Sequence, residues 1–239
     1  YTELATGMHY RDGDQWLESE AKIEILPNNA GAAASKGQHR AIFPPEIKSG
    51  IIELQTPENQ WLRSRVWGLA YFNGTTGESV LIAEVKESTG QVVGDNVVIY
   101  PDAFTDGCLA DIRYSYTLSG FEQDVVIRSQ LPGPEKFGMS PKNARLQVLT
   151  EFVEAPAPTK ESRQAGGLAD QSLSFGAMSI GSGKAFSVDA IGDTTGDVPV
   201  AKEWTPLEGR AFLIEEVYYE KVADQLQKLP AAGEYKGAS

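Results

Sequence analysis

Cysteine and histidine are scarce in this chain. Among its 239 residues there is one cysteine, Cys108, and there are two histidines, His9 and His39. A single cysteine excludes an intrachain disulfide, although it does not exclude export, because many exported bacterial proteins lack disulfides. The chain contains no Gly-x-Ser-x-Gly sequence for a nucleophilic triad, and a zinc site would need mostly carboxylate ligands. We therefore expect the histidines at surface or edge positions and Cys108 as a small packing residue.

An excess of basic charge is also missing. The chain has 33 acidic and 21 basic residues, which gives a formal net charge of −12. Because there is no basic stripe to displace counterions, nucleic acid and anionic membrane surfaces are excluded as partners. No apolar run approaches the length of a membrane span, so we expect no membrane insertion.

The chain is rich in segments in which apolar and polar residues alternate. One such segment, "DIRYSYT", puts Ile112, Tyr114 and Tyr116 on one face, and "AKIEIL" does the same with Ile23 and Ile25. The segment "RLQVLTEF" (145–152) repeats the pattern. Alternation of this kind is typical of half-buried strands, and turn-forming residues such as "NGTTG" (73–77) separate the segments at short intervals. The sequence predicts an all-β fold, a large antiparallel β-sandwich or super-sandwich.

The end of the chain departs from this rhythm. Val222, Leu226 and Leu229 have helical spacing, and Pro230 follows them, so we expect one short C-terminal helix within 217–229 after a final strand at 209–217. The stretch 154–170 is rich in Pro, Ala and Gly and lacks apolar periodicity. We therefore predict a β-sandwich body at 1–153, a linker or long loop at 154–170, and a smaller β unit with the helix at 171–239. This last unit either stands alone or completes the same sandwich.

One glycine-rich stretch, "FGAMSIGSGKAF" (175–186), is similar to a phosphate-binding loop. However, Met178 stands where the first glycine belongs, and Ala185 replaces the hydroxyl residue that would bind magnesium. We interpret the stretch as a glycine-rich β turn. It implies no cofactor.

Two kinds of site remain open at this level. Three loops hold aspartate pairs that could contribute to an oxygen-only calcium site, although Asp-rich loops more often form turns: Asp12 with Asp14, Asp102 with Asp106, and Asp193 with Asp197. The four tryptophans could stack on sugars, but we favour core and edge packing for them: Trp16, Trp61, Trp67 and Trp204. The spacing of the acids cannot select a pair of catalytic carboxylates for glycoside chemistry.

The stretch from Val98 to Gln130 carries four aspartates within what we expect to be three strands and two turns. Two of them are expected to form cross-strand ion pairs with Arg113 and Arg128. We interpret all four as structural: Asp102, Asp106, Asp111 and Asp124.

The same stretch resembles a hairpin in the N-terminal β-sandwich modules of very large exported bacterial proteins, which often carry Rhs-type (YD) repeats. The matching positions are Tyr100, Asp102, Phe104, Asp111, Tyr114, Tyr116, Gly120, Phe121 and Asp124. The resemblance implies a non-enzymatic shell or spacer piece, a signal peptide upstream and repeats downstream. It offers no catalytic residue. The start at Tyr1 is likewise expected to reflect a removed signal peptide or a fragment.

These observations favour a non-catalytic structural or interaction module of a larger secreted or cell-surface bacterial protein. Its expected partners are other domains of the same polypeptide or a surface partner, and we name no catalytic, cofactor-binding or metal-binding residue. The ligand-binding residues, if any, are unknown at this level. Two alternatives stay open, a carbohydrate-binding module and a sugar-active enzyme with paired carboxylates.

Overall fold

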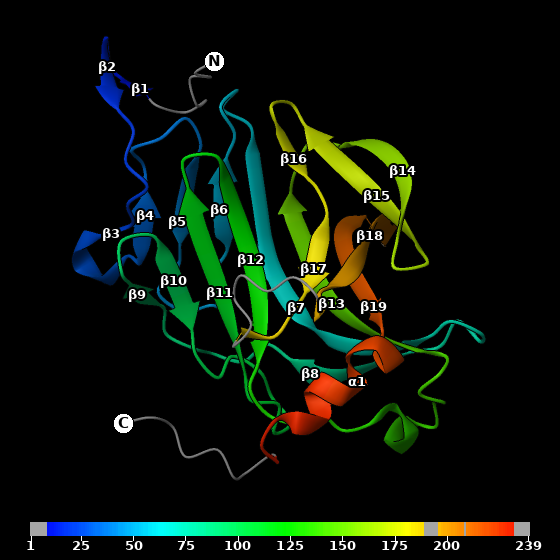
Figure 1. The fold of residues 1–239 in the computed structure, drawn as a ribbon. Helices are drawn as coiled ribbons and strands as arrows, with labels where there is room; N and C mark the ends of the chain where they lie inside the picture. The colour runs from blue at the N-terminus through cyan, green and yellow to red at the C-terminus, as the bar shows by residue number, and fades with distance from the viewer. Residues whose placement is uncertain (1–8, 189–195, 208, 232–239) are drawn as a thin grey trace.

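The computed structural model describes residues 9–188, 196–207 and 209–231. Within them the chain forms antiparallel sheets and one α-helix at the C-terminal end (Figure 1). The expected all-β fold with a short C-terminal helix is therefore confirmed. Two 3₁₀ turns, Pro27–Asn29 and Pro134–Phe137, lie in the connections.

A ten-stranded sheet, the large sheet, runs through most of the molecule. It includes strands from both of the units expected from the sequence, because β19 pairs with β13. Its strands are, in spatial order, β17 (Gly183–Ala185), β18 (Val198–Leu207), β19 (Arg210–Tyr218), β13 (Ala144–Glu154), β7 (Trp61–Asn73), β6 (Ile52–Gln55), β5 (Arg40–Phe43), β4 (Ala32–Ala34) and β3 (Glu24–Ile25), with β8 (Ser79–Glu84) on β7.

A four-stranded sheet, the small sheet, covers one face of the large sheet over β4 to β7 (Figure 1). Its order is β12 (Gly120–Ile127), β11 (Ala110–Thr117), β10 (Val97–Tyr100) and β9 (Gln91–Val93). As the alternation predicts, Ile112, Tyr114 and Tyr116 of β11 are fully buried. They pack toward the large sheet, where the ring of Phe43 lies 6.0 Å from that of Tyr114.

A three-stranded sheet lies beside the other end of the large sheet and consists of β14 (Thr159–Ala165), β15 (Leu168–Phe175) and β16 (Met178–Ile180). Phe175 of β15 packs against Phe152 of β13 and Trp204 of β18, with ring centroids 6.5 and 5.5 Å away. The stretch expected as a linker or long loop, 154–170, thus carries β14 and the start of β15. The side chains of β14 are mostly exposed on both faces of the strand, so its sequence shows no apolar periodicity.

The N-terminal hairpin of β1 (His9–Asp12) and β2 (Gln15–Glu18) stands apart from the sheets (Figure 1). Its strands are almost wholly exposed. The neighbouring β3 has only two residues, and Ile25 is 76% exposed while Ile23 is buried. The expectation that Ile23 and Ile25 share a buried face is wrong, because the strand is too short to keep Ile25 under cover.

The remaining elements close one end of the molecule. The helix α1 (Tyr219–Lys228) follows β19 directly and buries Tyr219, Val222 and Leu226, within the range expected for it. A hairpin joins β7 to β8, and its turn lies in the segment 73–77, which the sequence identifies as turn-forming. Its turn is stabilised by Asn73 Oδ1, which accepts hydrogen bonds from the N–H groups of Thr75 and Thr76. Gly77 has a positive φ in this turn.

Candidate functional site

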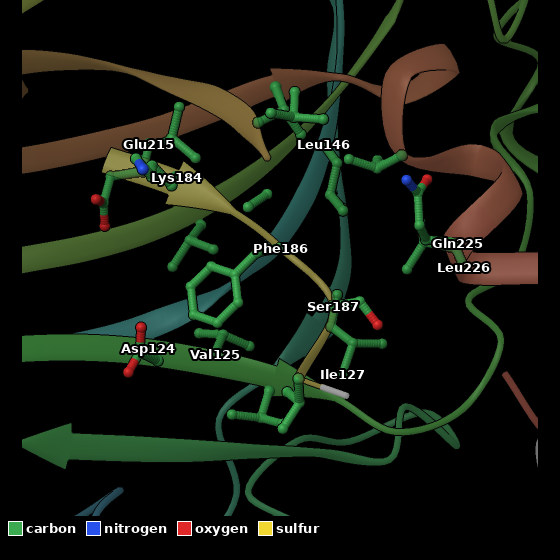
Figure 2. Close-up of a pocket in the computed structure, with 18 of the residues that line it drawn as sticks. Asp124, Val125, Ile127, Leu146, Lys184, Phe186, Ser187, Glu215, Gln225 and Leu226 are labelled. Atoms are coloured by element: carbon green, nitrogen blue, oxygen red, sulfur yellow. The ribbon is translucent and has the colours of Figure 1, made fainter. Parts of the chain in front are cut away.

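A groove of about 720 Å³ lies between β12, at the edge of the small sheet, and strands β13 and β19 of the large sheet (Figure 2). It exists because the two sheets differ in width. The four strands of the small sheet stop at β12, and the three-stranded sheet covers only the neighbourhood of β18. Neither of these two sheets covers the inner face of β13 and β19 between them.

Apolar side chains from several elements form the walls of this groove. Val125 comes from β12, Leu146 and Val148 from β13, and Leu226 from α1. Phe186, just after β17, extends its ring into the groove and is 46% exposed (Figure 2). The strand residues point inward because alternate positions of each strand face the opposite sheet.

On the inner face of the large sheet, one row of residues paired across adjacent strands explains where the groove is polar. Leu69, Val148, Glu215 and Lys202 face one another across β7, β13, β19 and β18. Leu69 and Lys202, at the two ends of the row, are buried under the covering sheets. Val148 and Glu215, in the middle, line the groove.

Glu215 is an acid without a direct partner in this position. Among the described residues it makes neither a hydrogen bond nor an ion pair. Burial raises the pKa of Glu215 to about 7, while the charge of Lys202 lowers it and the charge of Asp124 raises it. Near neutral pH this carboxyl group is therefore divided between its protonated and ionised forms.

The other charged groups of the groove are paired at its rim. Asp124 is on the opposite side of β12 from Val125, and its Oδ2 accepts hydrogen bonds from Nε and Nη2 of Arg113 at 3.0 and 2.9 Å. Lys184 Nζ lies 3.0 Å from Asp197 Oδ2. Within each pair the opposite charges compensate each other. Glu215 therefore differs from the other described carboxyl groups that line the groove, because it has no direct partner among the described residues.

Lys202, the neighbour of Glu215, is engaged elsewhere. Its Nζ is 3.0 Å from Asp170 Oδ1 on β15, and both side chains are almost fully buried. The same carboxylate accepts hydrogen bonds from the Lys202 N–H and from Arg163 Nε. Burial of Asp170 favours its neutral form, but the hydrogen bonds from Lys202 and Arg163 lower its pKa overall. We conclude that Lys202 holds the three-stranded sheet to β18.

The outer face of the large sheet is built differently, from ladders of ion pairs and aromatic rings. Arg145 Nη1 is 2.7 Å from Glu216 Oε1, and Arg65 Nε is 2.7 Å from Glu151 Oε2. Trp67 belongs to this face, is 41% exposed, and contacts Phe212 edge-on. This face is thus polar and charge-compensated, with a single well-exposed tryptophan.

The tryptophans do not form one platform. Trp204 is buried, Trp16 lies on the N-terminal hairpin, and the face of Trp61 is covered by the guanidinium of Arg63 at 4.8 Å. Packing, which we favoured, accounts for Trp204 and Trp61, whereas Trp16 and Trp67 remain exposed.

The four aspartates between Val98 and Gln130 have structural contacts, as expected. Asp124 pairs with Arg113, and Asp111 pairs with Arg128 at 2.7 Å. Asp102 and Asp106 are turn residues with positive φ. Asp102 also pairs with Lys86 at 2.8 Å, and Asp106 Oδ2 accepts a hydrogen bond from Thr105 Oγ1.

The cysteine and the two histidines, which are scarce in this chain, have mostly packing roles. Cys108 is buried, and burial raises the pKa of its thiol to about 12. His9 is exposed. His39, expected at the surface or an edge, is instead buried against the ring of Tyr116 at 4.7 Å, and burial lowers its pKa. Its contact with the carbonyl of Gly120, 3.3 Å from Nε2, explains why a histidine is tolerated there.

The aspartate pairs considered for calcium do not join a larger cluster of acidic side chains in the described part of the chain. No group of three His, Cys, Asp or Glu side chains there is placed to hold a metal ion. Asp12 and Asp14 lie at the exposed tip of the N-terminal hairpin, and Asp193 lies outside the described residues. The helix α1 is too short to cross a membrane, and no other described helix could do so.

The glycine-rich stretch 175–186 forms the end of β15, β16 and β17 with tight turns, as expected. What the sequence reasoning missed is that this stretch contributes Lys184 and Phe186 to the groove. The available signal was Phe186 itself, an aromatic residue that no alternating segment explains. Compared with known proteins, the chain matches no family model, no curated protein and no solved structure.

Proposed function

We propose that this protein is a non-catalytic binding module of a larger exported or cell-surface protein, and that its binding site is the groove beside β12. The proposal combines the groove with the resemblance of the Val98–Gln130 stretch to modules of exported proteins. The observation that carries it is a groove with apolar walls between two sheets of unequal width.

The size and lining of the groove support binding. A volume of about 720 Å³ is in the range of small-molecule sites, which are mostly apolar with a few polar groups. Val125, Leu146, Val148 and Phe186 offer apolar surface that a ligand would remove from water. Each square ångström of apolar surface buried in this way contributes about 25 cal/mol.

The pairing of the acids supports a non-catalytic role over a sugar-active one. Glycoside hydrolysis uses two carboxyl groups with separate duties on either side of a sugar. In the groove, Asp124 is held by Arg113 and Asp197 by Lys184, which leaves Glu215 as the one described carboxyl group there without a direct partner. A single carboxyl group can orient a ligand but cannot supply both duties.

An apolar fluorescent probe tests the groove. We expect anilinonaphthalene sulfonate to bind the folded protein saturably and Phe186→Ala to weaken the binding several-fold. Phe186 is well exposed, so its removal leaves the fold intact. The matched control is Trp67→Ala, which removes an equally exposed aromatic ring from the opposite face of the large sheet. Equal binding by the wild type and both variants would contradict the proposal.

A second candidate is carbohydrate binding on the outer face, favoured by the exposed ring of Trp67 among arginine and glutamate side chains. Aromatic rings with polar neighbours suit the faces and hydroxyl groups of sugars. A glycan array with the wild type and Trp67→Ala decides this point. Saturable binding that Trp67→Ala abolishes and Phe186→Ala preserves would place the ligand on the outer face and overturn the groove.

A further inference from the structure

Glu215 gives the groove one chemical preference. Its carboxyl group belongs to the inner-face row, between Val148 and Lys202. Apolar side chains such as Val125 and Phe186 line the same groove (Figure 2). It makes no hydrogen bond or ion pair with any described residue. A partly buried carboxyl group without a partner is unfavourable when ionised, and a ligand that supplies the partner removes that cost.

The positive charges near Glu215 are already engaged. Lys202 is bound to Asp170, Lys184 to Asp197, and Arg113 to Asp124. The nearby Arg128 is likewise paired, with Asp111. In the described part of the chain, the ionised form of Glu215 therefore lacks a direct counter-ion, and an incoming cation would not have to displace one of these pairs.

We infer that the groove takes an amphiphilic amine, a small apolar molecule with one ammonium group, whose ammonium pairs with Glu215 while its hydrocarbon part contacts Val125, Val148 and Phe186. This inference rests on the proposed function, because it names the ligand class of the same groove. An ammonium group donates three hydrogen bonds and carries the charge that the carboxylate needs.

Protons and the amine compete for the same carboxylate. The pKa of Glu215 is about 7 because the group is buried, so the empty groove holds a mostly neutral carboxyl group at mildly acidic pH. An ammonium ion binds the ionised form and expels the proton. Binding is thus expected to strengthen as the pH rises through neutrality, and binding near pH 7 is expected to release a fraction of a proton.

Isothermal titration calorimetry of the intact chain with n-octylamine, below its micelle-forming concentration, tests this inference. The amine stays charged throughout, so only the protein changes between about pH 5 and about pH 8. We expect binding at least about tenfold tighter at the higher pH, and heats near pH 7 that vary with the ionisation enthalpy of the buffer. For n-octanol, which has the same chain and no charge, we expect weaker binding with little pH dependence.

Two variants make the result specific to Glu215. Glu215→Gln should abolish the preference for the amine and its pH dependence while n-octanol still binds. Glu203→Gln, the same change at an exposed position of the adjacent strand β18, should behave as the wild type.

The outcomes separate the inference from the proposed function. If n-octanol and n-octylamine bind alike at both pH values, the amine preference is wrong and the groove remains a binding site. If the amine binds more tightly at the lower pH, its ammonium group does not compete with a proton for Glu215, and the inference is overturned. If neither compound binds and anilinonaphthalene sulfonate also fails to bind, the proposed function fails as well.

Discussion

Glu215 and Glu216 are neighbours on β19 but lie on opposite faces of the large sheet, and their carboxyl groups differ in whether they have hydrogen-bond partners. Glu216, on the outer face, accepts hydrogen bonds from Arg145 Nη1 at 2.7 Å and from Gln147 Nε2 at 2.8 Å. Glu215, on the inner face, has no such partner among the described residues, and burial raises its pKa to about 7. Because both residues are glutamates, the difference shows that the face of the sheet on which an acid lies decides its partners and its pKa.

The contrast extends to the whole of each face. The outer face joins its acids to arginines in ladders, for example Glu151 with both Arg65 and Arg210. The inner face is mostly apolar. Its charged groups are either paired, as Asp170 is with Lys202, or, like Glu215, have a shifted pKa and no direct partner among the described residues. A charged group on the inner face therefore either has a partner or has a shifted pKa.

The largest effect is expected from removing a partner on the inner side. Asp170→Ala leaves the buried Lys202 ammonium, and the Lys202 N–H, without an acceptor. Breaking a buried pair in this way is expected to lower the free energy of unfolding by about 3–5 kcal/mol. Urea denaturation at neutral pH measures the change, and Glu203→Gln serves as the surface control. A loss below about 1 kcal/mol would show that pairing is unimportant there.

Glu215 should dominate one part of the pH dependence of stability. Its carboxyl pKa rises from 4.5 in the unfolded chain to about 7 in the folded protein, so the folded state holds the proton more tightly. The free energy of unfolding should therefore fall as the pH rises from about 4.5 to about 7, by up to about 3 kcal/mol, and then level off.

Glu215→Gln removes this contribution. The difference in the free energy of unfolding between the variant and the wild type should thus grow in favour of the variant across that pH range. Urea denaturation of both proteins at several pH values measures it. Parallel pH profiles of the two proteins would contradict the raised pKa.

The adjacent substitution should have the opposite sign. Glu216→Gln keeps the shape of the side chain and removes the charge that Arg145 and Gln147 bond to, so it should destabilise the protein by about 1–2 kcal/mol. At about pH 8, Glu215→Gln should instead stabilise it. Thermal or urea denaturation of the pair at that pH is sufficient, and the same sign for both variants would remove the distinction between the faces.

The smallest effect concerns the charge at the rim of the groove. Asp124 is one of the groups that raise the pKa of Glu215, so Asp124→Asn should lower that pKa, and the released Arg113 guanidinium acts in the same direction. A carbon-13 NMR titration of the Glu215 carboxyl group measures the shift. Glu122→Gln, an exposed change on the same strand, should leave it unaltered. A rise in the pKa after Asp124→Asn would contradict this account.

The elements that could be predicted from the sequence are those with a strong local pattern. The alternation in "DIRYSYT" corresponds to β11, and the spacing of Val222 and Leu226 corresponds to α1. The strand β14 escaped prediction because both of its faces are largely exposed, and Ile25 was misplaced because β3 has only two residues. A strand without a buried face has no period to detect.

The candidate site could not be predicted in the same way. Glu215 and Glu216 are consecutive identical residues, and Phe186 lies in a glycine-rich stretch whose sequence indicates only turns. The expected cross-strand ion pairs with Arg113 and Arg128 are present, with Asp124 and Asp111 respectively, since such pairs follow from a local hairpin. Glu215, by contrast, meets β12 from a strand about ninety residues away along the chain, and no local pattern records such a meeting.

Local patterns alone determined that this chain forms sheets, where most strands turn, and that a helix follows the last strand, because side-chain periodicity and turn chemistry act over a few residues. The tertiary structure decided which acid is paired and where the surface is hollow. The physical reason is that a groove arises from the unequal widths of two packed sheets, and the pKa of an acid depends on which groups those sheets bring to it.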